Sequence, residues 1–167
     1  RTRDTLEDAV FDGIVDIACD EHDSKFALCD IIFLCATVDY NIECLPWLKQ
    51  IIRPGCILTD VGSVKGEIHK EITALSMAPN FIGGHPMAGS EKTGYEHSTD
   101  HLIENAYYIL TPSEEVGLDK IGVYTELVTS IGALPMILTW EEHDYITAAV
   151  SHLPHVVAAA LVNLVNK

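Results

Sequence analysis

The sequence predicts an α/β fold with a mainly parallel sheet, because short apolar runs alternate along the chain with segments of helical periodicity. The apolar runs have the composition of strands buried on both faces, and they lie at residues 30–36, 56–60, 80–84, 106–110 and 133–138. The chain has 167 residues, of which 48% are hydrophobic. That length corresponds to about one domain, and the hydrophobic content is sufficient for a real core.

Helices are expected between these runs. Apolar side chains recur on one face at helical spacing over residues 42–52, 64–75 and 118–128. The sequence Thr139-Trp-Glu-Glu142 resembles a capping box, so a long helix should begin near Trp140 and run toward the C-terminus. Pro154 lies inside that helix and should kink it, because its ring removes a backbone donor and clashes with the preceding turn.

Composition restricts the class of protein. The formal net charge of -15 argues against binding to nucleic acid or to an anionic membrane, because phosphate contacts need clustered Lys and Arg. No apolar run approaches the roughly 18 residues of a membrane span, and the N-terminus has no signal-peptide pattern, so a cytoplasmic protein is expected. The cysteines include no Cys-x-x-Cys pair and are expected to be reduced core thiols, not zinc ligands or disulfides; they are Cys19, Cys29, Cys35, Cys44 and Cys56.

Both ends of the chain are expected to be incomplete. A dinucleotide-binding fold opens with a strand, the pattern Gly-x-Gly-x-x-Gly and a helix whose N-terminus takes the pyrophosphate. This chain has no such pattern and begins directly with a helical stretch, as if the first βαβ unit of roughly 30 residues were missing. At the other end, residues 151–167 read as an apolar helix that nothing after it covers. The sequence is therefore interpreted as a fragment.

Three polar motifs mark the candidate site. They are Asp60-Val-Gly-Ser-Val-Lys-Gly66, Gly83-Gly-His-Pro-Met-Ala-Gly-Ser-Glu-Lys-Thr-Gly94, and His143-Asp-Tyr145 followed by Ser151-His-Leu-Pro-His155. His85 stands between glycines and a proline at the end of a predicted strand, a setting that presents its imidazole to a ligand. Packing or a turn contact is the structural alternative for His85, and helix capping is the alternative for Ser63.

Together these motifs resemble those of the prephenate dehydrogenase family, which makes the tyrosine precursor by NAD-linked oxidative decarboxylation and has arogenate dehydrogenases as close relatives. The resemblance covers nearly the whole chain and includes Glu104-Asn-Ala106 before the strand into Thr111-Pro112. It implies an incomplete doubly wound, Rossmann-like nucleotide-binding domain over residues 1–139 that lacks its first βαβ unit. Residues 140–167 would be the first helix of an all-helical dimerisation domain, so a homodimer is expected.

The reaction of this family needs a base, and the resemblance implies that the base is His85. The substrate is a cyclohexadienol: C4 loses a hydride to the nicotinamide, carbon dioxide leaves C1, and the hydroxyl proton must be taken up. A neutral imidazole with an ordinary pKa near 6.5 suits that task. Ser63, at the end of the neighbouring strand, corresponds to the family residue that orients the imidazole through its other ring nitrogen.

The resemblance also implies which residues surround the ligands. Cofactor contacts are expected from the turns after two neighbouring strands, at Ala36, Thr37, Val38, Asp60, Gly62 and Ser63. Substrate contacts are expected at Ser90, Glu91, Ser151, His152 and His155. Ser151 and His155 share one helical face, which the family directs at the pyruvyl side chain. Lys65 and Lys92 are expected to be surface lysines, and a buried interface position is the structural alternative for His152.

Two features depart from the family pattern. The family binds the ring carboxylate with a downstream arginine, and Arg53 is the last arginine of this chain. The acidic residue that would mark the end of the second strand for NAD is also missing. NAD is the expected cofactor, and NADP is the alternative because Arg1 and Arg3 could accept a 2′-phosphate.

Two hypotheses from other classes stay open. His143 and Asp144, with His152 and His155, could form the metal site of a phosphohydrolase, in which case the other two motifs have no role. The chain could instead be a non-catalytic remnant that binds a partner through its terminal helix. The dehydrogenase hypothesis requires no metal, and it leaves the choice between prephenate and arogenate open.

Overall fold

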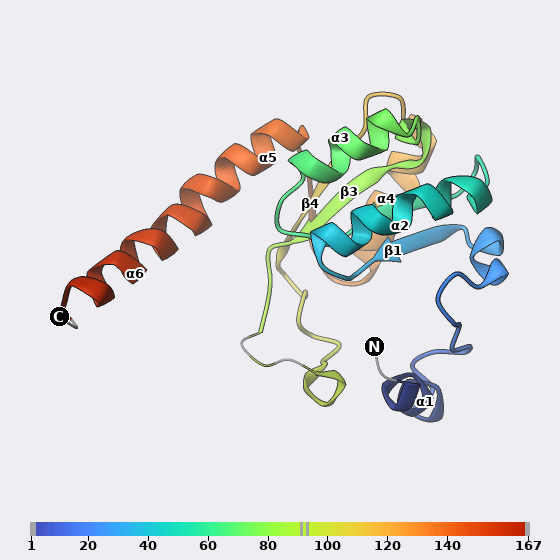
Figure 1. Cartoon of the computed structure of the whole chain (residues 1–167), viewed down its shortest axis with the longest axis horizontal. Helices are drawn as coiled ribbons and strands as arrows, with labels where there is room; N and C mark the ends of the chain where they lie inside the picture. The colour runs from blue at the N-terminus through green and yellow to red at the C-terminus, as the bar shows by residue number, and fades with distance from the viewer. Residues whose placement is uncertain (1–2, 91, 93, 166–167) are drawn as a thin grey trace.

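A computed structural model describes residues 3–90, 92 and 94–165 of the chain (Figure 1). The described strands are β1 (Ile31–Leu34), β2 (Ile57–Asp60), β3 (Ile82–Pro86), β4 (Tyr107–Pro112) and β5 (Leu134–Ile137). The β1–β2 and β4–β5 pairs are parallel, whereas β3 and β4 are antiparallel. A parallel bridge between Leu58 and Phe81 joins the two groups, so β2 lies beside β3. The predicted α/β fold with a mainly parallel sheet is confirmed.

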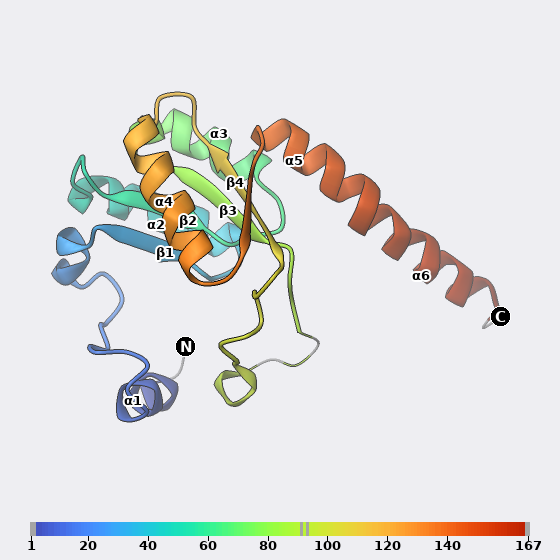
Figure 2. The same cartoon turned by 180° about the vertical axis from the view of Figure 1, so that it is seen from behind.

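Helices cover both faces of this sheet. The described α-helices are α1 (Arg3–Phe11), α2 (Val38–Ile51), α3 (Gly66–Ala74), α4 (Leu118–Ser130), α5 (Trp140–Thr147) and α6 (Leu153–Val165), with short 3-10 turns at Ser24–Leu28, Ala78–Asn80 and Tyr95–His97. Of these helices, α1 and α6 lie away from the sheet (Figures 1 and 2). Figures 1 and 2 show α2 and α3 on one face and α4 on the opposite face. The three helices predicted between strands are confirmed. The helix α2 begins earlier than predicted, because its first turn is mostly polar and adds little to the apolar pattern.

Apolar side chains pack against each face of the sheet. On one face lie Leu45 of α2 and Ile68 and Ile72 of α3, all fully buried. On the other face lie Tyr124 and Val128 of α4. Burial of each such side chain contributes roughly 1.5–3 kcal/mol to stability. The apolar spacing that predicted these helices is therefore the spacing of the core.

The cysteines only partly match the expectation. All five are reduced thiols in the structure. Cys56 is buried in the core, and Cys29 and Cys44 are partly buried against it. Cys35 is exposed, because it follows the last residue of β1 at the open end of the sheet. The prediction of core thiols is therefore wrong for Cys35.

A polar clamp ties α4 to the loop that precedes β2. The Lys120 ammonium donates hydrogen bonds to the carbonyl oxygens of Pro54 (2.5 Å), Cys56 (3.3 Å) and Pro79 (2.8 Å). The Asn80 amide nitrogen donates to the same Pro54 and Cys56 carbonyls, at 3.2 and 2.7 Å. These carbonyl groups have no strand partner of their own, so the side chains satisfy backbone acceptors that the fold partly buries.

Replacing Lys120 by methionine is expected to destabilise the protein by about 1.5–3 kcal/mol, because hydrogen bonds from a charged donor to several carbonyls would be lost. The urea midpoint would measure this change. Lys49→Met on the exposed side of α2 is the matched control, and it should leave the midpoint nearly unchanged. Equal midpoints for the two variants would contradict a stabilising clamp.

The C-terminal helix starts at the predicted capping box. The Thr139 hydroxyl accepts from the Glu142 amide at 3.2 Å, and the Glu142 carboxylate accepts from the Thr139 amide at 2.9 Å. A π-helical segment, Ala148–His152, joins α5 to α6, and Figures 1 and 2 show one continuous rod that leaves the domain. The expected kink at Pro154 is therefore wrong. The wider π turn just before Pro154 changes the hydrogen-bond register, so the missing proline donor is accommodated without a sharp bend.

The outer half of this rod is uncovered in the structure. No residue of α6 is buried, and its apolar side chains are exposed. By length and composition alone, the helix over residues 140–165 would be long and apolar enough to cross a membrane. This differs from the expectation that no apolar run approaches that length, since the few polar residues in the segment do not lower its mean hydropathy enough.

Candidate active site

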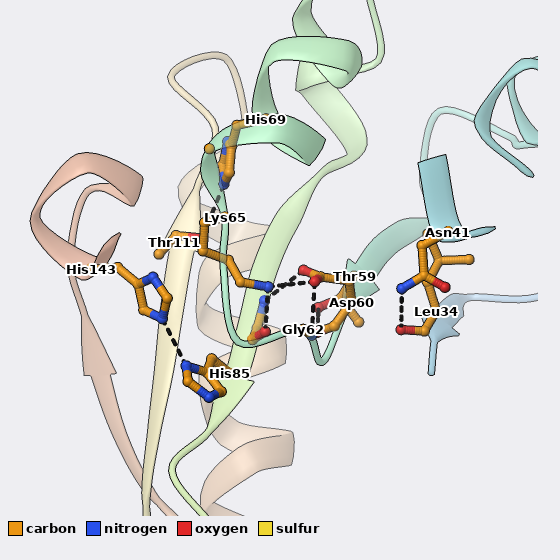
Figure 3. Close-up of polar contacts among 12 residues, drawn as sticks. Leu34, Asn41, Thr59, Asp60, Gly62, Lys65, His69, His85, Thr111 and His143 are labelled. Atoms are coloured by element: carbon orange, nitrogen blue, oxygen red, sulfur yellow. Dashed lines mark hydrogen bonds and ion pairs between the residues drawn. The ribbon is translucent and has the colours of Figure 1, made fainter. Parts of the chain in front are cut away.

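The carboxyl ends of β2 and β3 carry the centre of the candidate site. Asp60 ends β2 and is fully buried; its carboxylate forms an ion pair with Lys65 and accepts from the amide of Gly62 at 2.9 Å. The Lys65 ammonium also donates to the Gly84 carbonyl at 2.8 Å, so one cation bridges β2 and β3 just before His85 (Figure 3). The prediction that Lys65 is a surface lysine is wrong. Lys92 is exposed, as predicted.

Glycines 83 and 84 are required for this close packing. A Cβ atom on Gly84 would lie 2.6 Å from the Asp60 carbonyl oxygen and 2.8 Å from the Tyr124 hydroxyl. On Gly83 it would lie 2.3 Å from the Thr111 hydroxyl. Contacts this short are repulsive, so any side chain there would push β3 away from its neighbours. The Gly-Gly pair therefore places His85 at the end of a strand held tightly on both sides.

His85 is half-buried and its imidazole contacts a second histidine. Its Nδ1 lies 2.8 Å from Nε2 of His143, which comes from α5, and Figure 3 shows the two rings approaching from opposite elements. Burial lowers the pKa of His85 to about 4, and the neighbouring His143 and Lys65 act in the same direction. His85 is therefore a neutral imidazole across the physiological pH range.

His143 is held in turn by the next residue of α5. Its Nδ1 lies 2.8 Å from a carboxylate oxygen of Asp144, and the Thr147 hydroxyl lies 3.4 Å from its Nε2. Asp144 also accepts from the backbone amides of Lys65 and Gly66, both at 2.8 Å. Burial acts to raise the pKa of Asp144, but these hydrogen bonds outweigh it and leave the pKa below the ordinary value. The α5 helix is thereby fastened to the first turn of α3.

Ser63 does not occupy the predicted orienting position. The Nδ1 atom of His85 contacts His143 instead, and Ser63 is exposed, without a side-chain hydrogen bond in the described part of the chain. It is also not the N-cap of α3: that position is Lys65, and α3 begins at Gly66. Asp144 accepts from the amides of Lys65 and Gly66 at this helix start, and Ser63 is exposed.

The other predicted cofactor residues lie at the open ends of β1 and β2. Ala36 and Thr37 are exposed and Val38 is half-buried at the start of α2. A Cβ atom on Gly62 would lie 2.9 Å from the Asp60 carboxylate and 3.1 Å from Val38, so glycine is needed to keep this turn close to β1. The structure thus brings the β1–α2 and β2–α3 turns together at one edge of the sheet.

One residue at this edge escaped the sequence analysis. Asn41 is buried on α2; its amide nitrogen donates to the carbonyls of Leu34 (3.2 Å) and Ala36 (3.3 Å), and its oxygen accepts from the Ala36 amide at 3.2 Å. It therefore shapes the β1–α2 turn. The available signal was a polar residue beside Ile42 on the face of α2 that turns toward the sheet.

The predicted substrate residues are spread over two segments. Ser90 is exposed after β3, and Glu91 lies outside the described residues. Ser151 is half-buried, whereas His152 and His155 are exposed along the rod. His152 lies near enough for its charge to lower the pKa of His85. Of the three predicted substrate residues on the rod, His152 thus acts electrostatically on the His85 imidazole. Because His152 is exposed, it is not a buried interface histidine, which was the structural alternative.

A separate buried histidine behind the site makes stability depend on pH. His69 is 4% exposed, its Nε2 lies 3.0 Å from the Thr111 hydroxyl, and burial lowers its pKa to about 4. The unfolded chain therefore binds the proton more readily between pH 6.5 and 4, so this group's contribution to stability is present above pH 6.5 and is lost as the pH falls toward 4.

The free energy of unfolding should accordingly fall by at most about 3 kcal/mol from His69 across that window. Urea denaturation of the parent and of His69→Gln at a series of pH values would test this, with a shallower acid slope expected for the variant. His101→Gln, at an exposed surface position, is the control and should keep the parent slope. Parallel slopes for His69→Gln and the parent would remove His69 from the acid response.

The fold and this site define a class of protein: an α/β domain with a histidine near the carboxyl end of a central strand, followed by a long exposed helix. The sequence model of the prephenate dehydrogenase nucleotide-binding domain matches residues 2–137, and that of the prephenate dehydrogenase dimerisation domain matches residues 139–167. The chain belongs to the prephenate dehydrogenase family, as the motifs predicted.

Individual relatives agree with this assignment. The prephenate dehydrogenase of Lactococcus lactis subsp. cremoris is 39% identical over 137 residues, which are 80% of this chain and 36% of that protein. The Aquifex aeolicus prephenate dehydrogenase, solved with hydroxyphenyl propionate and NAD+, superposes with a TM-score of 0.87 at 33% identity, over 98% of this chain and 57% of that one. Synechocystis arogenate dehydrogenase gives 0.89 at 34% identity, over 98% and 58%. The chain thus spans less than two thirds of these proteins.

Proposed function

We propose that the protein containing this chain oxidises and decarboxylates prephenate with NAD. The observation that carries the proposal is the neutral His85 imidazole at the end of β3, on the same sheet edge as the turns after β1 and β2. Ligands of open α/β sheets bind at the carboxyl ends of the strands. A dehydrogenase of this family needs a base at that position to take up the hydroxyl proton.

The residues of the edge fit a nicotinamide cofactor. Gly62 has no room for a side chain, and Ala36 and Thr37 are small and exposed, so a flat ring can approach the backbone of both turns. When bound, NAD would supply the acceptor for the hydride that leaves C4. NAD is favoured over NADP because the Aquifex relative was solved with NAD+ and because the guanidinium of Arg3 already pairs with Glu7 at 3.3 Å. Arg1, the other candidate for a 2′-phosphate, lies outside the described residues.

The chain's own residues then divide the work. His85 accepts the proton of the C4 hydroxyl, a contribution of about 10²- to 10⁴-fold for a general base. The carboxylated side chain of the substrate is proposed to bind along the rod at Ser151 and His155, and Ser90, Glu91 and His152 are proposed as further substrate contacts. Ser63, exposed beside Gly62, is left free to contact a ligand. A homodimer is proposed because residues 139–167 match the family's dimerisation domain and α6 exposes an apolar surface.

Arogenate is the second candidate substrate, because the Synechocystis arogenate dehydrogenase superposes as well as the prephenate dehydrogenase does. The metal-dependent phosphohydrolase is not favoured: Asp144 contacts His143, and His143 contacts His85. Within the described residues no group of three potential metal ligands lies close enough to hold an ion. The deciding experiment follows reduced nicotinamide formation by the full-length protein with prephenate and with arogenate. If the full-length protein turned over neither substrate, the proposal would be refuted.

A further inference from the structure

We propose that His143 and Asp144 are positioning residues that hold His85 in the tautomer with a free Nε2 lone pair. The inference rests on the proposed function, in which His85 is the base. The three side chains form a line: Asp144 contacts Nδ1 of His143, and Nε2 of His143 contacts Nδ1 of His85, each at 2.8 Å. His143 uses a different ring nitrogen for each of its two neighbours, so the position of its one proton fixes the direction of both hydrogen bonds.

The direction of the line follows from the carboxylate. Asp144 accepts from the backbone amides of Lys65 and Gly66. Because a backbone amide N–H can only donate, both carboxylate oxygens of Asp144 must act as acceptors. Nδ1 of His143 must then carry its proton toward Asp144. A neutral His143 therefore has its lone pair on Nε2, and Nδ1 of His85 must donate to it. The remaining nitrogen of His85, Nε2, is unprotonated.

This tautomer is the one that proton transfer requires. In the proposed reaction the O–H bond of the substrate breaks and an N–H bond forms at Nε2 of His85, while the electrons of the O–H bond form the carbonyl as the hydride leaves C4. The resulting imidazolium keeps its Nδ1 proton, shared with His143, and no further proton moves along the line. The opposite tautomer would present an N–H to the substrate hydroxyl and could not accept from it.

The positioning pair belongs to a different element from the base. His85 lies on β3, whereas His143 and Asp144 lie on α5, the first turns of the rod that the dimerisation-domain match includes. Asp144 locks α5 to the start of α3 through two amides, and His143 is fully buried in between. The tautomer of the base is thus set from α5, the helix that follows the sheet.

The test uses the full-length protein and three variants. His143→Gln keeps a carbonyl oxygen near the position of Nε2, so it can still accept from His85, whereas His143→Leu cannot. Asp144→Asn replaces the acceptor by an amide that can donate to His143 and invert the line. Glu141→Gln, an exposed acid-to-amide change on the same helix, is the matched control. The readouts are the ¹⁵N NMR signals of the His85 ring, assigned with His85→Asn, and kcat and KM.

The parent protein is expected to show His85 protonated at Nδ1. His143→Leu and Asp144→Asn should lose that preference and lower kcat by about 10-fold or more with KM changed little, because ligand contacts are untouched. His143→Gln should retain the Nδ1 proton and most of kcat, and Glu141→Gln should match the parent. If His143→Leu does not fold, the comparison of Asp144→Asn with His143→Gln decides.

Two results would overturn the inference. A parent His85 protonated at Nε2 would do so whether or not the protein turns over either substrate, so this failure is separate from failure of the proposed function. The second result is a kcat loss in His143→Gln as large as that in His143→Leu and Asp144→Asn. It would show that His143 supplies packing and not the direction of a hydrogen bond.

Discussion

Replacing His85 by asparagine in the full-length protein is expected to lower kcat by at least about 100-fold while KM stays close to the parent value. Asparagine keeps a polar group of similar reach but has no basic nitrogen, so the hydroxyl proton loses its acceptor. His85 is half-buried against His143, and asparagine is smaller than histidine, so the substitution should not move β3. Formation of reduced nicotinamide under saturating substrate would measure the loss.

His101→Asn is the matched control for this prediction. His101 is exposed and pairs only with surface carboxylates of Asp100 and Glu104 in the described structure, so kcat should be unchanged. A His85→Asn protein with the parent kcat would remove His85 from the mechanism. A large rise in KM at unchanged kcat would assign His85 to substrate binding instead.

Breaking the buried ion pair between Asp60 and Lys65 is expected to cost about 3–5 kcal/mol of stability. Both side chains are at most 1% exposed, so Asp60→Asn or Lys65→Met would each leave an uncompensated charge inside the protein. The double variant should recover a large part of the loss, because neither charge then remains. Urea denaturation of the two single variants and the double variant forms the cycle that measures this coupling.

The surface pair of Asp30 and Arg53 provides the comparison. Its side chains are 93% and 46% exposed, so Asp30→Asn should change stability by less than about 1 kcal/mol. A loss from Asp60→Asn no larger than that from Asp30→Asn, or a double variant as unstable as the sum of the two single variants, would contradict the ion pair's structural role.

The alternation of strands and helices could be predicted because each element has a local signature. Residues 56–60 begin with three apolar residues and end on a charge, and β2 occupies residues 57–60, one residue fewer than predicted. Thr139 and Glu142 are three positions apart, which is enough to define a helix start. Pro154 was misjudged, because the rule against proline concerns α-helical register and the preceding segment is π-helical.

The interior of the site could not be predicted in the same way. Lys65 looks like a solvated residue in any local window, and its burial depends on Asp60 and on the Gly84 carbonyl, which lies 19 residues later. The contact between His85 and His143 spans 58 residues. The spacing of apolar residues along the sequence carries no information about contacts between residues so far apart. The motifs therefore indicated which residues matter, while the partner of the imidazole required the three-dimensional structure.

The helix is continuous from Trp140 to Val165. The direction in which the side chains of α6 point therefore depends on how many residues separate them from α5. Each residue added to or removed from a helix turns everything beyond it by about 100°. A single insertion within Ala148–His152 would leave His143 anchored and would turn residues 153–165 by that angle relative to His85. The number of residues in this segment therefore fixes the rotation of α6 about the helix axis relative to α5.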